Sequence, residues 1–374
     1  MKSLSISQVD AVFANGSYTI EFLLYFKNTI PTKRVLSALA KVAADFWPLF
    51  GTYQAGKIHS AEFEEAACFE ERIVPEAFDA SAAIETILNE YKDIHSSAMT
   101  RLFRVTVIQF TNGTVIIPSL RHLAGDGYSY FYFLATWAAL SRSHLMPLKV
   151  HLIRPFYKPN YHRTILKKFH FPETNLPTPP SQNDATVQCQ EIPGEEVRNA
   201  VHAINADAGQ QISANDFLSA VFLKKAVQVR AGHFSDRVSL TMPIDVRKQI
   251  PHYGPKFLGN GIMFHTATFR KQTVETATVA ELAIAIREAR PTITRESYLF
   301  FLERIEAVIQ NREFQDLRPF DPDTGCLVTN LSRMPADTLN FGAGTPDLIF
   351  PLTIEKNAAA ILSKDNVYQV RMAF

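Results

Sequence analysis

Apolar residues recur along the chain at two spacings: a period of two, typical of strands, and a period near 3.6, typical of helices. In the first half, strands are predicted at residues 17–27, 102–110 and 114–122. Helices are predicted at residues 35–46, 80–91 and 128–143, with Thr32 capping the first of them. Residues 53–60 predict a short hairpin that turns at Ala55-Gly56.

The second half of the chain has the same mixture of patterns. Strands are predicted at residues 237–246, 261–270, 325–331, 348–353 and 366–374. Helices are predicted at residues 194–208, 214–230, 276–289 and 298–312, with Ser213 capping the second of them. Because both halves mix helices with strands over similar lengths, the pattern predicts an α/β (α+β) protein built from two subdomains.

The composition changes between Pro147 and Pro180, where seven prolines fall among basic residues. Such a stretch is typical of a long connection rather than of a helix or strand. A chain of 374 residues also exceeds one ordinary core, so two domains are expected. We therefore predict an N-terminal subdomain at residues 1–146, a crossover linker at 147–185 and a C-terminal subdomain at 186–374.

The composition excludes several classes of function. With 47% hydrophobic residues and a net charge of +1, the chain is globular and has no general attraction for nucleic acid. The three cysteines are scattered, so we expect no metal site and a reducing compartment. The N-terminus lacks a secretory signal, and the longest apolar stretch, residues 128–140, is too short to span a membrane. These features predict a cytoplasmic protein, which we expect to be a monomer.

Candidate chemistry lies in the sequence His122-Leu-Ala-Gly-Asp126-Gly, between a predicted strand and a predicted helix. Its two glycines allow a tight turn, and such a turn can hold an imidazole at the fixed angle that a general base needs. The alternative is a histidine at a strand end beside an Asp126 that merely caps the next helix. The spacing alone does not separate the two interpretations.

Residues 51–57 spell GxxxxGK, the beginning of a phosphate-binding loop. The next residue is Ile58, which has no hydroxyl for Mg²⁺, and the glycines follow a predicted helix rather than a strand. A plain hairpin is therefore the favoured interpretation.

Five motifs in order along the chain resemble those of the BAHD acyltransferases, the coenzyme-A-dependent HxxxDG family of the chloramphenicol-acetyltransferase-like superfamily. The motif around His122 is similar to the family signature. Asp245-Val246-Arg247, followed by Tyr253 and Gly259-Asn260, is similar to the region of its second arginine. The remaining similarities are the opening at residues 4–10, the helix end at 46–51, and residues 328–335 followed by Asn340-Phe341-Gly342-Ala343-Gly344.

The resemblance implies two chloramphenicol-acetyltransferase-like subdomains, each a mixed sheet flanked by helices, with the active site between them. It implies that His122 is the general base in direct transfer from acyl-CoA to a hydroxyl or amine, with no covalent acyl-enzyme. Acyl-CoA would be a co-substrate, with no permanently bound cofactor. Asp126, Gly127 and Arg247 would be structural at the site, with Asp126 paired to Arg247, and Thr329 would contact the acyl group or the acceptor. The alternatives are a surface arginine at a strand end for Arg247 and an ordinary β-branched strand residue for Thr329.

The chain departs from the family pattern at three positions. Asn340 replaces an aspartate, Ala343 replaces a tryptophan, and Leu331 stands where many plant members have a tryptophan. The resemblance does not assign the cations that hold the coenzyme A phosphates. The candidates are Lys224, Lys225, Lys248 and Lys256, each of which can equally be a solvated surface charge.

Two other functions stay open at this stage. The first is a condensation-type enzyme that takes its acyl group from a carrier-protein thioester, although the doubled histidine usual there is absent because Arg121 precedes His122. The second is a binding module that kept the fold without the activity. The chain contains neither the GxSxG nor the HExxH motif, so the residues point to neither a serine hydrolase nor a zinc protease.

Overall fold

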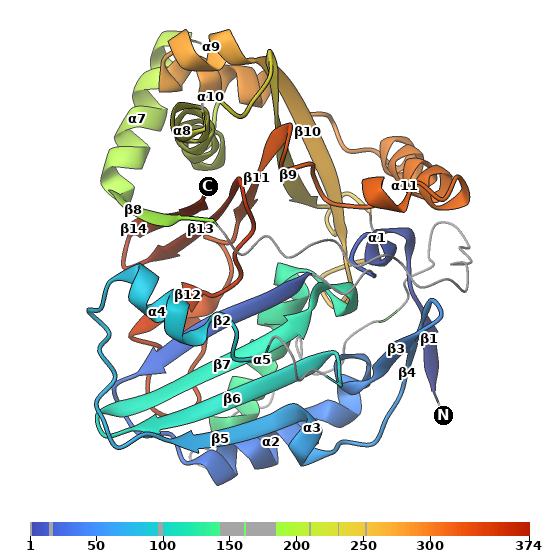
Figure 1. Cartoon of the computed structure of the whole chain (residues 1–374), viewed down its shortest axis with the longest axis vertical. Helices are drawn as coiled ribbons and strands as arrows, with labels where there is room; N and C mark the ends of the chain where they lie inside the picture. Colours follow the sequence, from blue (N-terminus) through green and yellow to red (C-terminus); the bar gives the residue numbers. More distant parts are fainter. Residues whose placement is uncertain are drawn as a thin grey trace.

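The computed structural model describes residues 2–14, 18–95, 100–142, 161, 185–208, 211–230, 232–250 and 253–374. In these residues the chain forms a five-stranded sheet, a six-stranded sheet and a small three-stranded sheet, with helices around them (Figure 1). Most of the predicted linker, residues 147–185, lies outside the described residues. None of the described helices is both long enough and apolar enough to cross a membrane.

The five-stranded sheet has the order β12-β2-β7-β6-β5. Its strands are β2 (Thr19–Phe26), β5 (Phe69–Ile73), β6 (Phe103–Phe110), β7 (Gly113–Arg121) and β12 (Leu348–Pro351). The nearby helices are α2 (Thr32–Asp45), α4 (Ile84–Tyr91) and α5 (Gly127–Arg142). β6 and β7 form the predicted antiparallel hairpin, which ends one residue before His122.

The six-stranded sheet has the order β10-β9-β11-β13-β14-β8. Its strands are β8 (Val187–Pro193), β9 (Arg237–Asp245), β10 (Ile262–Arg270), β11 (Gly325–Asn330), β13 (Ala358–Lys364) and β14 (Val367–Ala373). Its helices are α7 (Gly194–Ala208), α8 (Ala214–Val229), α9 (Lys271–Thr276) and α10 (Val279–Glu288), which gather at one end of the molecule (Figure 1). The mixed sheets flanked by helices confirm the predicted fold class.

The small sheet pairs β1 (Ser3–Ser5) with β4 (Lys57–His59), which also pairs with β3 (Thr52–Gln54). Ala55 and Gly56 both have positive φ, as the tight turn between β3 and β4 requires. The GxxxxGK sequence is therefore a hairpin and not a phosphate loop. Four short elements complete this part and its surroundings: α1 (Gln8–Ala11), α3 (Glu65–Cys68) and the 3₁₀ turns η1 (Trp47–Phe50) and η2 (His122–Ala124).

Several predicted boundaries were wrong. Thr32 is the first helical residue rather than the cap, and its predecessor Pro31 makes no side-chain capping bond. The helix predicted at 276–289 begins at Val279, because the Thr278 side chain caps α10 there, and the helix before it, α9, was not predicted. The strands β1, β5, β8 and β13 were not predicted. β13 begins with three alanines, whose low strand propensity hides it.

The strand β12 comes from the second half of the chain but pairs with β2 in the sheet of the first half (Figure 1). Ile349 and Phe350 are buried there, so the strand from the second half adds apolar contacts to the first sheet. In the same way, α11 (Arg295–Gln310) lies beside α1 rather than with the other late helices. The predicted boundary at residue 186 therefore does not separate the two sheets completely.

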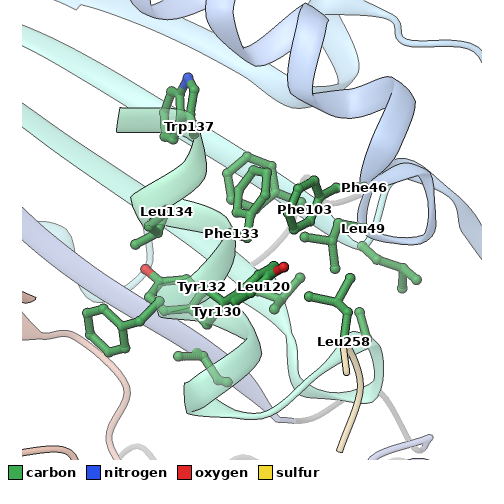
Figure 2. Close-up of a cluster of buried hydrophobic side chains, with 14 of the residues drawn as sticks. Phe46, Leu49, Phe103, Leu120, Tyr130, Tyr132, Phe133, Leu134, Trp137 and Leu258 are labelled. Atoms are coloured by element: carbon green, nitrogen blue, oxygen red, sulfur yellow. The ribbon is translucent and has the colours of Figure 1, made fainter. Parts of the chain in front are cut away.

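The helix α5 is buried on almost every side, and its aromatic residues form the centre of the first core (Figure 2). Phe133 lies 4.9 Å from Phe103, ring centre to ring centre, and the indole nitrogen of Trp137 donates to the Val35 carbonyl at 2.9 Å. These contacts fix α5 against β6 and α2. The turn that carries His122 is thereby anchored at both ends, by a central strand and by a buried helix.

Candidate active site

His122 lies where β7 ends and η2 begins, and its backbone N–H donates to the Tyr18 carbonyl at 2.9 Å. The glycines that follow provide space rather than a left-handed backbone, since Gly125 is extended with φ 173°. A Cβ atom at Gly125 would lie 2.8 Å from the Ser129 Cβ, and one at Gly127 would lie 2.9 Å from a Leu331 methyl. The contact with the Ser129 Cβ therefore requires glycine at position 125, whereas at position 127 the end of the Leu331 side chain would have to move.

Two side chains from other segments hold the His122 ring. Phe13 stacks on it with ring centres 3.8 Å apart and an angle of 20° between the planes. The Asn260 side-chain oxygen lies 3.1 Å from His122 Nδ1. The imidazole plane is thus set by one stacking contact and one hydrogen bond.

The bonds of Asn260 determine which ring nitrogen carries the proton. Its amide nitrogen donates to the Asp10 carboxylate at 2.8 Å and to the His122 carbonyl at 2.9 Å. A flipped amide would place its oxygen against two acceptors, so the oxygen must face the ring. His122 Nδ1 therefore donates to Asn260, and Nε2 is left with the lone pair that a general base uses.

Burial lowers the pKa of His122 below its ordinary value, and the negative charge of Asp126 only partly opposes this effect. The imidazole is therefore neutral near pH 7. A neutral imidazole with a fixed tautomer is the form that accepts a proton from a nucleophile.

Asp126 forms a buried ion pair with Arg247. Arg247 Nη1 and Nη2 each donate to one oxygen of the carboxylate at 2.9 Å, and both side chains are less than 5% exposed. Burial alone would raise the pKa of Asp126, but the Arg247 guanidinium outweighs it and holds this pKa below its usual range. The contact expected from the resemblance is present in the structure.

Asp126 also makes the helix-capping contact that the alternative interpretation assigned to it. One carboxylate oxygen accepts from the Ser129 backbone N–H at 2.9 Å, in the first turn of α5, and the other accepts from the Gly261 N–H at 2.9 Å. Arg247 follows β9 and also lies over the Tyr128 ring at 4.5 Å. One carboxylate therefore joins the start of α5 to the segment between β9 and β10.

A cavity of about 240 Å³ opens beside His122, between residues of the two large sheets. Its lining includes His122, Gly127 and Thr329. Phe13, Phe22 and Phe264 contribute apolar walls. Since both sheets supply the lining, the cavity exists only when the two are packed together.

Two further ionisable residues line the same cavity. Burial raises the pKa of Glu355 to about 7. Arg371, on β14, is 5% exposed. The patterns that identify strands do not show that either side chain faces a cavity, so sequence reasoning missed both. Asp10 and Asn260 were noticed only as parts of family motifs, and Phe13 was not noticed at all.

The remaining candidates lie elsewhere. Lys224 donates to the Ala277 carbonyl near the start of α10, and the candidate lysines Lys224, Lys225, Lys248 and Lys256 are absent from the described lining of the cavity. Residues 340–344 form a loop in which the Asn340 side chain accepts from the Gly342 N–H at 2.7 Å. The Asn340 side chain thus contacts the backbone of its own loop. Within the described residues, no group of three or more metal-binding side chains occurs.

Two mixed sheets that are flanked by helices and share a cavity form the chloramphenicol-acetyltransferase-like class of fold. A family model described as the Transferase family matches residues 2–371, and the chain belongs to this family, the BAHD acyltransferases. A search of curated protein sequences found no match.

Solved structures with the same fold support this class. TRI101 of F. graminearum, in complex with coenzyme A and deoxynivalenol, superposes with a TM-score of 0.74 at 11% identity, over 100% of this chain and 95% of that one. Vinorine synthase has a TM-score of 0.74 at 18% identity, over 100% and 90%. The first condensation domain of the CDA synthetase has a TM-score of 0.62 at 13% identity, over 99% and 89%.

Proposed function

We propose that the protein transfers an acyl group from acyl-CoA directly to a hydroxyl or amine of a small molecule. The observation that carries the proposal is the single oriented imidazole of His122 at the edge of an apolar cavity shared by both sheets. Membership of an acyltransferase family and a fold similar to a protein solved with coenzyme A support the choice of donor. Acyl-CoA is then a co-substrate, and no bound cofactor takes part.

In this reaction His122 Nε2 removes the proton from the acceptor hydroxyl or amine as its oxygen or nitrogen attacks the thioester carbonyl. The tetrahedral intermediate collapses as the carbon–sulfur bond breaks, and the imidazolium returns the proton to the leaving thiolate. One histidine thus acts as base and then as acid, so no covalent acyl-enzyme is needed. Thr329 Oγ is the candidate hydrogen-bond donor to the acyl oxygen, because Thr329 lines the same cavity.

In the proposed mechanism Asp126 and Arg247 act on shape rather than on protons. Both carboxylate oxygens of Asp126 already accept hydrogen bonds from Arg247, Ser129 and Gly261, so Asp126 does not relay the proton of His122. Asn260 and Asp10 provide the orientation that a carboxylate provides in serine hydrolases. The largely apolar wall of the cavity excludes water, which would otherwise compete with the acceptor for the thioester.

The test is release of free thiol from acetyl-CoA and longer acyl-CoAs, measured with a panel of alcohols and amines. The His122→Ala variant should lose about 10²- to 10⁴-fold in rate, the usual contribution of a positioned base. His202→Ala is the matched control, because this histidine is exposed on α7 and should change nothing. The rate should also fall at acid pH with a midpoint below 6.5, because burial lowers the pKa of His122.

Full activity in a folded His122→Ala variant would contradict the proposed mechanism. Absence of thiol release by the unchanged protein, with every donor and acceptor tried, would contradict acyl transfer itself. The two results are separable, because the role of His122 is tested by comparing the variant with the unchanged protein, whereas acyl transfer is tested on the unchanged protein alone.

A further inference from the structure

One wall of the cavity is a face of the second sheet, and Arg371 lies on it. The register of the sheet pairs Thr329 with Ala360, and Ala360 with Arg371. Residues paired across neighbouring strands point to the same face, so the three side chains form one row, and all three line the cavity. With strands about 4.8 Å apart, the Cα atoms of Thr329 and Arg371 are separated by about 10 Å.

The Arg371 guanidinium is held on one side only. Nη1 donates to the Thr353 carbonyl at 2.6 Å, and the group lies over the Phe350 ring at 5.5 Å. Nε and Nη2 are shielded from solvent, and neither has a hydrogen-bond acceptor among the described residues. Burial lowers the pKa of Arg371 to about 10, which still leaves it cationic at neutral pH.

This arrangement differs from that of the other arginine in the cavity lining. Arg247 has carboxylate partners in both Asp126 and Asp245. The ion pairs identified in the described residues include none that involves Arg371. A buried cation with unsatisfied donors is unfavourable unless an anion joins it.

The geometry of the unsatisfied nitrogens indicates which anion would fit. Nε and Nη2 lie on one edge of the planar guanidinium, and this edge matches the two oxygens of a carboxylate. Ala358, Ala360 and Ala373 line the same part of the cavity, and their small side chains leave space beside Arg371. Glu355 would repel a bound carboxylate only weakly in slightly acidic solution, because burial raises the pKa of Glu355 to about 7 and the side chain is then largely protonated.

We propose that Arg371 binds a carboxylate group of a substrate, through Nε and Nη2, while the reacting carbonyl lies near Thr329 and His122. The carboxylate has two sources: the free end of a dicarboxylic acyl group on coenzyme A, or a carboxylate on the acceptor. The inference rests on the acyl transfer proposed above and specifies the class of substrate.

The donor source is tested by comparing succinyl-CoA with butyryl-CoA, measured as thiol release at pH 6.5 with one neutral acceptor. The unchanged protein should prefer succinyl-CoA by about tenfold or more in kcat/KM, since a charge-assisted hydrogen bond is lost with the neutral chain. Arg371→Gln should remove this preference, so that the kcat/KM values for succinyl-CoA and butyryl-CoA become nearly equal within the variant. Arg371→Lys keeps the positive charge but lacks the two parallel N–H donors of the guanidinium, so it should keep only part of the preference.

The acceptor source is tested with acetyl-CoA as the donor and with 4-hydroxybenzoate and 4-hydroxybenzamide as matched acceptors. If the carboxylate belongs to the acceptor, the unchanged protein should prefer the acid by about tenfold, and Arg371→Gln should lose this preference. Arg237→Gln is the control for both assays, because this exposed arginine starts β9 and is absent from the cavity lining.

A third measurement does not depend on catalysis. Calorimetric titration should show that succinate or benzoate binds the unchanged protein better than the corresponding amide, and that Arg371→Gln abolishes the difference. Absence of any carboxylate preference in transfer and titration alike, or an unaltered preference in folded Arg371→Gln, would overturn the proposal. If the glutamine variant does not fold, the lysine variant decides. If the unchanged protein turns over no donor, the proposed acyl transfer is wrong. The titration alone then tests whether Arg371 binds a carboxylate.

Discussion

The ring of His122 is held by side chains from two segments distant in sequence, and each has a distinct effect. Phe13 sets the plane of the ring, and Asn260 sets its tautomer because Asp10 prevents the amide from flipping. The lowered pKa of His122 follows from the burial that these contacts create. At the residue scale, therefore, the reactivity of one histidine depends on three residues outside its own motif.

Glu355 provides a prediction at the same scale. Burial raises its pKa from 4.5 to about 7, so the fold favours the protonated form, and this favourable contribution disappears as the pH rises from 4.5 through 7. Glu355→Gln should therefore be more stable than the unchanged protein at pH 8, by about 2–3 kcal/mol, and nearly equal to it at pH 4.5. Urea unfolding at the two pH values measures the difference. A difference that does not vary with pH would show that Glu355 titrates normally.

At the scale of elements, the Asp126–Arg247 pair connects the start of α5 with the segment that follows β9. The pair is buried and bidentate, and Asp126 also accepts two backbone N–H groups. The turn that carries His122 and the second sheet are therefore joined by a buried polar contact. Breaking such a contact leaves a charge buried without its partner.

The pair can be tested by removing one partner at a time. Asp126→Ala and Arg247→Ala should each lower the free energy of unfolding by about 3–5 kcal/mol, because each leaves one buried charge alone. Combining them should cost less than the sum of the two. Asp245→Asn is the control, since this carboxylate contacts the same guanidinium but is 44% exposed and should cost less than about 1 kcal/mol. Additive effects in the double variant would argue against a coupled pair.

At the scale of the whole molecule, three features join the two large sheets. They are the strand β12, which crosses into the first sheet, the packing of α11 against α1, and the Asp126–Arg247 pair. The cavity between the sheets takes its lining from both. We therefore expect the sheets to unfold together, although each has its own core.

The two tryptophans, Trp47 and Trp137, make this expectation testable, because both lie with the first sheet. Their fluorescence reports the first core, while far-UV circular dichroism reports both sheets. The two signals should change at the same urea concentration in the unchanged protein. In Arg247→Ala the two transitions should separate, because one of the three connections is removed. Separate transitions in the unchanged protein would show that the sheets unfold independently.

The sequence determined the class of the fold and the position of the catalytic candidate. The periodicity of strands and helices depends only on residues close together in the sequence. For this reason β6, β7, α7 and α8 were predicted nearly to the residue. The motif around His122 is also local, because a strand, a turn and a helix follow one another there. The helix cap at Ser213 was predicted for the same reason.

Only the tertiary structure decided what surrounds that histidine. Three features depend on residues that lie more than a hundred positions apart in the sequence. They are the pairing of β12 with β2, the contact of Asn260 with His122, and the position of Arg371 on the wall of the cavity that His122 also lines. Such contacts depend on how sheets pack, and hydrophobic spacing along one strand carries no information about the neighbouring strand. Alternation places Arg371 on one face of β14, but only the packing of the sheets makes that face part of a cavity.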